Sequence, residues 1–340
     1  MDSSNAKKEA KSRKTAPARL LELSHHADPS VQLAVAKHAN TPVTALEYLS
    51  GHGKFTILKA VAEHPSTPSA ILERLAFHKQ HTVVEVVAKN SKTLRSTLER
   101  LAAHQHEAVR KALTANSAVT TAILETLSHD ESEGVRYGVA RKYLCPPALL
   151  EQLASDQSAW VRGGVAANSN APLEVVRRLA CDPEALVRGR TVYRLIKDQQ
   201  NDLLEVLVRD ANRDVRDAVA EDIGYSSHPK RVQLIAPLAR DLDARIRERV
   251  ARYGDLDTVT LELLLKDPDP EVRKALGYNK VQPTPAFVIE ALANDLVAQV
   301  RWQAVCNGAI TRATLERLAA SDPAEHIRER AALELNSRQP

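Results

Sequence analysis

The sequence predicts an all-helical repeat solenoid of about twelve two-helix units, each roughly 26 residues long. Three observations predict this class. A Val or Ile recurs at intervals of 26 residues or slightly more, prolines precede a Leu-rich segment in many units, and only 4% of residues are aromatic although aliphatic residues abound. Because each unit of a solenoid touches only its neighbours, 340 residues can form one continuous stack.

The recurring apolar residue defines position zero of each unit. The first six intervals are all 26 residues, and the later ones are 28, 31, 26, 28 and 27. Small insertions are therefore expected near residues 198–201 and 223–232. The residues at position zero are Val31, Ile57, Val83, Val109, Val135, Val161, Val187, Val215, Ile246, Val272, Val300 and Ile327.

Each unit is predicted to contain two short helices. The first runs from about three residues before position zero to about seven after it, as in residues 158–168. The second is Leu-rich, and its start is marked by prolines, whose missing N–H costs nothing there: Pro42, Pro68, Pro147, Pro172 and Pro285. Asn at +7 suits the end of the first helix: Asn90, Asn116, Asn168, Asn279 and Asn307. Asp-Pro pairs are expected to cap the start of the first helix: Asp182-Pro183, Asp267-Pro268 and Asp322-Pro323.

These motifs resemble the leucine-rich repeat variant family and, more broadly, HEAT-like and armadillo repeats. The residues that carry the resemblance are Asp182-Pro183 before Val187-Arg188, and Val161-Arg162 before Val165-Ala166-Ala167-Asn168 and Pro172. The resemblance covers residues 20–336 and implies a right-handed superhelix whose concave side is lined by the helices bearing the Val-Arg signature. One member of the variant-repeat family carries an iron–sulfur cluster, but this sequence lacks clustered cysteines, so no cofactor is expected.

The net charge of +4 lies entirely in the first 19 residues. Residues 1–19 hold six basic and two acidic residues, whereas the rest of the chain holds 41 of each. This segment is rich in Ser, Ala and Lys without apolar periodicity, so residues 1–19 are expected to form a disordered tail before a single repeat domain at 20–336. The tail is either a solvated terminus or a basic arm for nucleic acid or another anion.

Cysteine usage and hydropathy indicate a cytoplasmic protein. Cys145, Cys181 and Cys306 are far apart and form no CxxC pair, so neither a zinc site nor a disulfide framework is supported. No run of about 18 apolar residues occurs, and the N-terminus lacks the apolar stretch of a signal peptide. No membrane span and no metal are expected.

Two charged positions change together along the chain. Position −5 is His in the first four units (His26, His52, His78 and His104) and Asp in the last eight (Asp130, Asp156, Asp182, Asp210, Asp241, Asp267, Asp295 and Asp322). Position +1 is Arg from the fourth unit on: Arg110, Arg136, Arg162, Arg188, Arg216, Arg247, Arg273, Arg301 and Arg328. This joint change predicts that Asp and Arg are structural partners within or between units. The alternative is that the arginines bind phosphate.

The histidines and acidic residues offer little support for catalysis. Neighbouring units lie about 10 Å apart, which is too far for successive histidines to share a metal, so helix capping is the simpler role. No HExxH, P-loop or GxSxG pattern is present. Asp217, Glu221 and Asp222 could include a general acid or base, but a solvated helix face explains them as well. The sequence therefore predicts a protein that is not an enzyme.

The repeat pattern breaks in units five to seven. The exposed face of the first helix should comprise −1, +2, +3 and +6, and here it carries aromatic residues, arginines and glycines. Glycine inside a helix costs about 0.5–1 kcal/mol, and either close helix packing or a ligand-binding hollow would offset that cost. The hollow would be formed by Tyr137, Arg141, Trp160, Gly163, Gly164, Gly189, Arg190 and Tyr193, with Gly138 beside them. Trp, Tyr and Arg are enriched in binding hot spots.

A second cluster is predicted near the C-terminal end. It comprises Lys274, Tyr278 and Trp302 beside Cys306, with Arg249 and Arg252 between the two clusters. We expect a binding scaffold that recognises a peptide or protein segment in the concave groove. The alternative is a nucleic-acid-binding HEAT-like protein, favoured by the basic tail and opposed by the neutral body.

Overall fold

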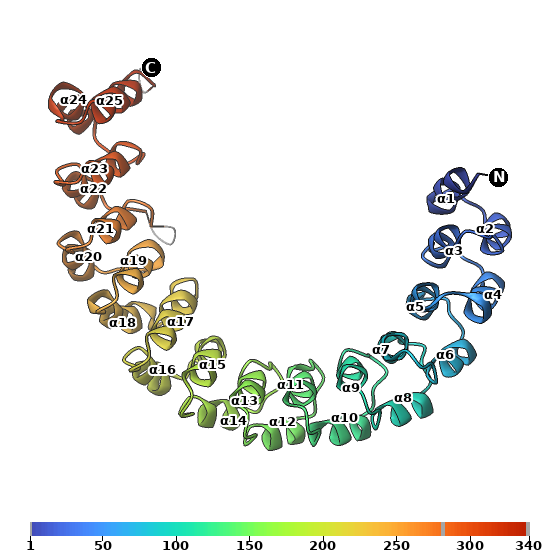
Figure 1. Ribbon diagram of the computed structural model, residues 1–340. Coiled ribbons are helices and arrows are strands. Elements are labelled where there is room, and N and C mark those ends of the chain that lie inside the picture. The colour runs from blue at the N-terminus through green and yellow to red at the C-terminus, as the bar shows by residue number, and fades with distance from the viewer. Residues whose placement is uncertain (1, 280–282, 338–340) are drawn as a thin grey trace. The chain divides into compact units, whose positions relative to one another are not determined.

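The computed structural model describes residues 2–279 and 283–337, and it divides into two compact units, Met1–Pro172 and Leu173–Pro340. Those residues form twenty-five α-helices, one 3-10 helix and no strand, which confirms the all-helical solenoid (Figure 1). Residue 1 of the predicted tail and residues 280–282 of the predicted repeat domain lie outside the described residues.

The helices are short, and each is described within its own unit. The first unit contains α1 (Ser3–Lys11), α2 (Pro17–Ser24), α3 (Pro29–Ala36), α4 (Val43–His52), α5 (Phe55–Glu63), α6 (Ser69–Leu75), α7 (His81–Lys89), α8 (Arg95–Leu101), α9 (Glu107–Thr114), α10 (Thr121–Ser128), α11 (Glu133–Arg141), α12 (Pro147–Leu153) and α13 (Ala159–Ala166). The second contains α14 (Leu173–Leu179), α15 (Ala185–Lys197), α16 (Asn201–Leu207), α17 (Arg213–Gly224), α18 (Arg231–Ile235), η1 (Ala236–Arg240), α19 (Ala244–Tyr253), α20 (Thr258–Leu265), α21 (Pro270–Leu276), α22 (Ala286–Leu292), α23 (Ala298–Val305), α24 (Arg312–Ser321) and α25 (Glu325–Ser337).

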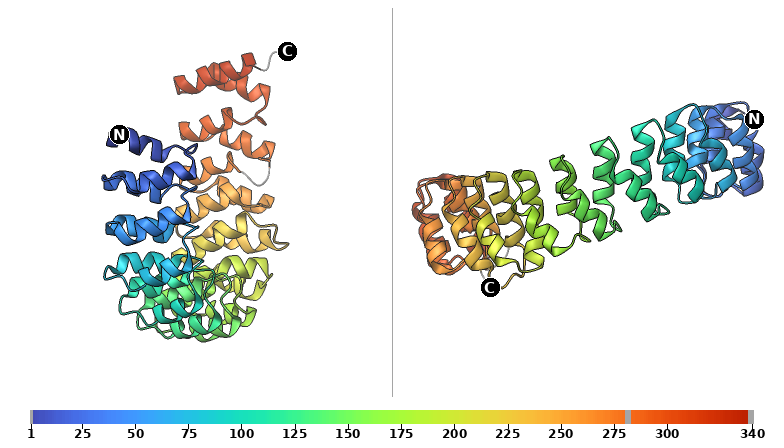
Figure 2. Two further views of the ribbon diagram at one scale, coloured as in Figure 1. Left: turned by 90° about the vertical axis from the view of Figure 1, so that its right-hand side faces the viewer. Right: turned by 90° about the horizontal axis from the view of Figure 1, so that it is seen from below.

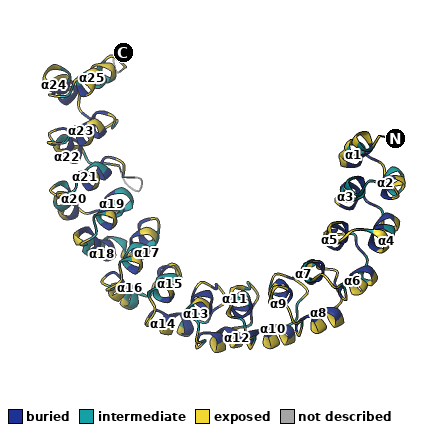
Figure 3. Cartoon of the chain, in the orientation of Figure 1, coloured by how far each residue is buried: buried dark blue, intermediate teal, exposed yellow. Residues whose placement is uncertain are grey.

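Odd-numbered helices from α3 onward are the predicted first helices, and even-numbered ones are the second helices. Within each unit the first helices lie side by side in one layer on the inner side of the curve, and the second helices form the outer layer (Figures 1 and 2). All twelve position-zero residues have no exposed surface, so the core is the seam between the two layers (Figure 3). The 26-residue spacing therefore marks the residues that are buried between the two helix layers.

The first helices begin two residues later than the Asp-Pro pairs predict. α21 starts at Pro270, and its N-cap is Asp269, whose carboxylate accepts the N–H of Glu271 at 2.9 Å. Asp267 is not the cap. It accepts the N–H of Asp269 at 2.9 Å and so fixes the turn that leads into the helix. The predicted capping role of Asp182, Asp267 and Asp322 is wrong, because each carboxylate accepts the N–H of the residue just before the helix.

The predicted insertions appear as longer first helices. α15 has 13 residues and α17 has 12, whereas α13 has eight. α15 is followed by Gln199, whose φ of 54° lies in the left-handed region. α17 is followed by residues 225–230, which lead into the short α18.

The expectation of a disordered N-terminal tail is wrong. Residues 3–11 form α1, whose Ala6 and Ala10 are fully buried in the packing of α1 against α3. Arg19 secures the segment by donating from Nε to Glu9 Oε1 at 2.9 Å. Two alanines one turn apart supply a narrow apolar stripe that the high charge of the segment conceals. The solenoid of the first unit thus starts before residue 20. Every helix within the described ranges is too short or too polar to span a lipid bilayer.

Candidate functional site

The Arg at +1 forms a bridge to the Asp at −5 of the following repeat. Arg136 donates from Nε to Asp156 Oδ2 at 2.7 Å and from Nη2 to Oδ1 at 3.0 Å. Its Nη1 donates to the carbonyls of Asp130 and Glu131, and Asp156 also accepts the N–H of Ser158 at 2.8 Å. The predicted Asp–Arg partnership is confirmed, and it joins consecutive repeats through a bidentate contact.

The same bridge recurs along both units. It links Arg110 to Asp130, Arg188 to Asp210, Arg216 to Asp241, Arg247 to Asp267, Arg273 to Asp295 and Arg301 to Asp322. Hydrogen bonds from Arg301 hold the pKa of Asp322 below its usual range, although burial opposes this shift. The arginines in these bridges are neutralised by carboxylates, so they do not form a stripe of unpaired cations for phosphate.

Three of the histidines at −5 fix the same turn that Asp fixes later in the chain. In His26, His78 and His104 the Nδ1 atom accepts the N–H of the residue two positions on, at 3.0–3.1 Å. The interpretation of these three as helix caps is wrong, because the N-caps of α3, α7 and α9 are Asp28, Gln80 and His106. No group of three His, Cys, Asp or Glu side chains is placed to hold a metal ion within the described parts of the chain.

A second ladder of hydrogen bonds lies at the C-terminal ends of the first helices. His64 donates from Nε2 to the carbonyl of His38 at 2.9 Å, and Lys142 donates from Nζ to the carbonyl of Asn116 at 2.8 Å. We call the donors rung residues, because each side chain reaches a carbonyl of the preceding repeat. Further rung residues are His38, Asn90, Asn116, Asn168, Asn279 and Asn307. The predicted turn role of Asn at +7 is confirmed, but these bonds between repeats were not predicted.

Trp160 is the more exposed of the two aromatic site residues predicted in the first unit. Its side chain is 53% exposed on α13. Its ring meets the half-buried ring of Tyr137 from α11 edge to face, with the ring centroids 6.2 Å apart and the planes at 90°. Arg141, at the end of α11, is exposed. Such a contact between aromatic rings is worth about 0.5–1.5 kcal/mol, so it holds the indole in place on the surface.

Gly138 and Gly164, two glycines of the predicted hollow in the first unit, are packing residues. A Cβ on Gly164 would lie 3.0 Å from Tyr137 Cδ2 and 3.1 Å from Ala140 Cβ, and one on Gly138 would lie 2.5 Å from Thr114 Oγ1. Gly163 is buried as well. The prediction that +3 is exposed is wrong, because first helices of adjacent repeats touch there. Other buried residues at +3 are Ala34, Ala60, Val86 and Ala112.

The remaining residues of the predicted hollow belong to α15 in the second unit. A Cβ on Gly189 would meet no described atom within 4 Å, so this glycine faces open space. Tyr193, one turn later, is 69% exposed, and Arg190 is half-buried. Gly189 thus differs from Gly164, which is enclosed by its neighbours.

The predicted C-terminal cluster is a set of aromatic and ion-pair contacts, some within a first helix and some between successive first helices. Arg249 donates to Asp217 at 2.8 Å and to Glu221 at 3.2 Å. Arg252 pairs with Glu248, and its guanidinium carbon lies 6.0 Å from the ring centroid of Tyr278. Lys274 pairs with Glu271, and Trp302, which is 37% exposed, lies 5.7 Å from the ring of His326.

The acidic candidates on α17 are therefore not equivalent. Asp217 and Glu221 are engaged by Arg249, whereas no hydrogen bond or ion pair of a described residue engages the carboxylate of Asp222. Burial, with a smaller effect from Glu221, raises the pKa of Asp222. Among the thiols, Cys145 is buried, and burial raises its pKa to about 11, whereas Cys181 and Cys306 are exposed.

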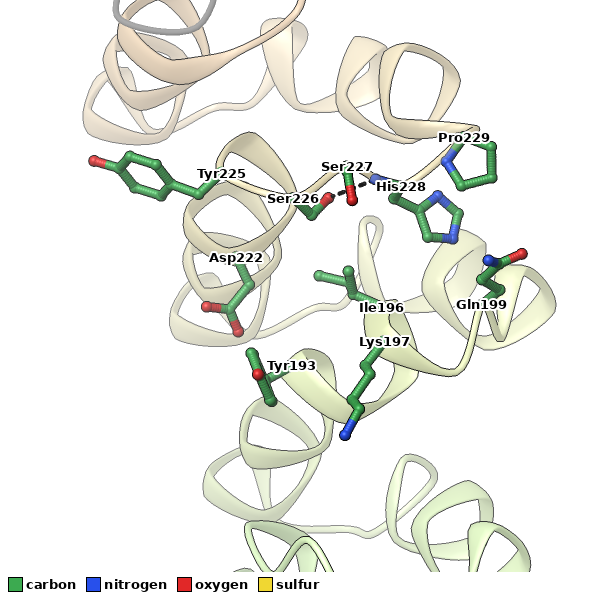
Figure 4. A pocket seen from close by; sticks show the side chains of 10 residues that line it. All are labelled: Tyr193, Ile196, Lys197, Gln199, Asp222, Tyr225, Ser226, Ser227, His228 and Pro229. Atoms are coloured by element: carbon green, nitrogen blue, oxygen red, sulfur yellow. Dashed lines mark hydrogen bonds between the residues drawn. The ribbon is translucent and has the colours of Figure 1, made fainter.

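A pocket of about 480 Å³ lies in the second unit at the C-terminal ends of the long helices α15 and α17 (Figure 4). Its lining residues are Tyr193, Ile196, Lys197, Gln199, Asp222, Tyr225, Ser226, Ser227, His228 and Pro229. Of these, the sequence had marked Tyr193 as a ligand-binding residue and had considered Asp222 as a general acid or base. The sequence feature that could have indicated this pocket is the pair of insertions near 198–201 and 223–232, which contribute residues to its lining.

The comparisons support the helical-repeat fold. A solved leucine-rich repeat variant with a repetitive structural motif is similar to this chain at 24% identity with a TM-score of 0.52, and the match covers 68% of this chain and 88% of that one. A designed armadillo repeat protein for modular peptide recognition aligns over 95% of this chain at 15% identity, and another, solved in complex with the peptide (KR)4, aligns over the same share at 16%. Their TM-scores of 0.11 carry no structural argument. The chain matches no family model and no curated protein.

Proposed function

We propose that this protein is a non-enzymatic scaffold that binds a peptide or protein segment on the exposed face of its first helices. The observation that carries the proposal is the exposure of Trp160, which stands edge-on to Tyr137 on that face. In a chain whose residues are only 4% aromatic, a half-exposed indole held in position is an anchor suited to a partner.

The second unit carries exposed aromatic residues of its own. Tyr193 on α15 is 69% exposed, and Tyr225 and Tyr278, which follow the ends of α17 and α21, are 61% and 49% exposed. Aromatic rings supply contact area at little cost in side-chain entropy, so several exposed rings within one unit favour an extended partner over a small one. Arg141 and Arg190 favour acidic residues in that partner.

Selection from a random peptide library displayed on phage, followed by anisotropy with labelled peptides, tests the proposal. Trp160→Ala should weaken the selected peptides by at least tenfold, and Arg190→Glu should weaken those that carry acidic residues. Tyr143→Ala is the matched control, because Tyr143 is 76% exposed but follows the end of α11 instead of lying on the helix face. Equal loss in both aromatic variants, or unfolding of Trp160→Ala, would contradict the proposal.

Nucleic-acid binding is the second candidate, favoured by one specific observation. Lys11, Arg13 and Lys37 line a single hollow beside α1 and α3. Anisotropy with labelled duplex and single-stranded DNA, at about 50 and about 200 mM salt, separates the two functions. Binding that weakens steeply with salt and is lost in Lys11→Glu/Arg13→Glu would favour nucleic acid.

A further inference from the structure

The pocket of the second unit lies where the rung ladder is interrupted. Its residue His228 forms the same local turn as two rung residues of the first unit. In His38, His64 and His228 the Nδ1 atom accepts the N–H two residues on, at 3.1, 3.1 and 3.2 Å. The carbonyl of each accepts the N–H three residues on, at 3.0–3.1 Å. His228 thus occupies the place of a rung residue in its repeat.

The rung bond itself is missing at His228. The Nε2 atoms of His38 and His64 reach the carbonyls of Ser12 and His38, both at 2.9 Å. In His228, which is 5% exposed, Nε2 is buried and has no hydrogen-bond partner among the described residues. Because Nδ1 accepts the N–H of Lys230, Nε2 carries the hydrogen of the neutral ring. Burial, with a smaller effect of Lys230, lowers the pKa of His228 and favours that neutral form.

The longer helices explain the missing acceptor. α15 continues for more than a turn beyond the length of α13, and the left-handed backbone of Gln199 then reverses the chain. The residue at +7 of that repeat, Arg194, therefore lies inside α15, and its carbonyl already accepts the N–H of Asp198 at 2.9 Å. Figure 4 shows the imidazole of His228 extending from the loop above the pocket toward Gln199 below it. A buried donor without an acceptor is unfavourable, so a ligand that supplies the acceptor gains binding free energy at this place.

We propose that this pocket binds a lysine- or arginine-containing peptide segment, with a backbone carbonyl of the peptide accepting the Nε2–H of His228. The proposal rests on the proposed function, since it names one contact of the same kind of partner. The acceptor is an amide carbonyl because every other rung residue donates to a backbone carbonyl. The carboxylate of Asp222 has no partner within the described chain and would receive the cationic side chain.

Two tyrosines complete the recognition of an extended segment. Tyr193 and Tyr225 line the pocket and are largely exposed, so their rings can cover the aliphatic part of a lysine or arginine. Tyr225 is itself supported by Tyr253, with the ring centroids 4.7 Å apart. A volume of about 480 Å³ accommodates a few residues of a peptide, within the range of ordinary ligand sites.

The test uses the full chain and the capped tripeptide acetyl-Ala-Lys-Ala-amide, titrated by NMR while the imidazole signals of His228 are followed. The expected result is saturable binding with a shift of the Nε2 signal. The matched peptide acetyl-Ala-norleucine-Ala-amide lacks the cation and should bind about tenfold more weakly. Absence of saturable binding of the lysine peptide at millimolar concentration, or equal binding of both peptides, would overturn the proposal.

Two variants assign the contacts. His228→Asn keeps an acceptor for the N–H of Lys230, as Asn168 does for Asn170, but its amide ends a bond short of the Nε2 position. It should fold normally and bind the lysine peptide about tenfold more weakly. Asp222→Asn should abolish the preference for lysine over norleucine. Unchanged binding in His228→Asn overturns the rung contact.

The outcomes remain distinct from those of the proposed function. Peptides from the library that depend on Trp160 but not on His228 would leave the proposed function standing and remove this pocket from it. If the tripeptide binds through His228 but the selected peptides bind equally well to Trp160→Ala, the pocket would stand and the proposed function based on Trp160 would fall.

Discussion

The guanidinium of Arg136 and the carboxylate of Asp156 meet side by side, with Nε–Oδ2 and Nη2–Oδ1 distances of 2.7 and 3.0 Å. The two residues are 20 positions apart and belong to consecutive repeats. Their side chains are 9% and 7% exposed, so the pair is held away from solvent. Arg136 Nη1 also donates to the carbonyls of Asp130 and Glu131, and Asp156 Oδ1 also accepts the N–H of Ser158.

Removal of one partner of this bridge should destabilise the protein strongly. Arg136→Ala leaves the carboxylate of Asp156 buried without its counter-ion, which costs about 3–5 kcal/mol. Urea denaturation followed by circular dichroism would measure the loss. Arg312→Ala is the control, because its pair with Glu316 is exposed and is worth less than about 0.5 kcal/mol. Similar midpoints for the two variants would show that the ladder contributes little.

Acid should weaken the protein through the same ladder. Hydrogen bonds from Arg301 lower the pKa of Asp322 in the folded chain, so the folded state binds fewer protons than the unfolded state below about pH 4. The stabilisation is complete above the unfolded pKa and is lost as the pH falls through the folded pKa. We expect the melting temperature of the protein to drop between pH 5 and 2. In Asp322→Asn the drop should be shallower, and an unchanged slope would exclude this contribution.

Two glycine-to-alanine substitutions should change stability in opposite directions. Gly164→Ala places a Cβ 3.0 Å from Tyr137 and 3.1 Å from Ala140, so helices must move apart at a cost of about 1–3 kcal/mol. Gly189→Ala meets no atom within 4 Å and should stabilise α15 by about 0.5–1 kcal/mol. The melting temperatures of both variants, compared with that of the unmodified protein, would test this prediction. A stabilised Gly164→Ala would disprove the close packing of α11 and α13.

Lys142 should be replaceable by asparagine but not by methionine. Its Nζ donates to the carbonyls of Thr114 and Asn116 at 3.0 and 2.8 Å, and burial lowers its pKa. Lys142→Met leaves both carbonyls without this donor and should cost about 1–3 kcal/mol. Lys142→Asn restores the donor used at Asn116 and Asn168, so its urea midpoint should match or exceed that of the unmodified protein. Equal midpoints for the Met and Asn variants would contradict a role for the rung bond.

Features repeated along the chain could be predicted from the sequence, because repetition exposes their periodicity. The apolar residues at position zero and the joint change from His to Asp and from Gln, Leu or Val to Arg are of this kind. Features that depend on contact between repeats could not. Gly164 is buried because α11 and α13 lie close together. The residue pattern within a single repeat does not indicate how close two neighbouring helices lie.

The candidate pocket escaped prediction for a related reason. Insertions near 198–201 and 223–232 were visible, but they lengthen α15 and α17 instead of adding loops alone. Because these helices are longer, His228, Asp222 and Tyr193 line one pocket at their C-terminal ends. The helix α1 was missed because its apolar stripe consists of Ala6 and Ala10 alone, within a strongly charged segment.

The arginine bridges begin only at the fourth repeat, and this gives the array a direction. Gln32, Leu58 and Val84 stand at +1 in the first three repeats, where no bidentate contact to the next repeat can form. In a chain of nearest-neighbour couplings, fraying starts at the weakest junction. Amide hydrogens of α3, α5 and α7 should therefore exchange with solvent before those of α9 and α11. Local unfolding would therefore begin in the first three repeats and spread toward the fourth.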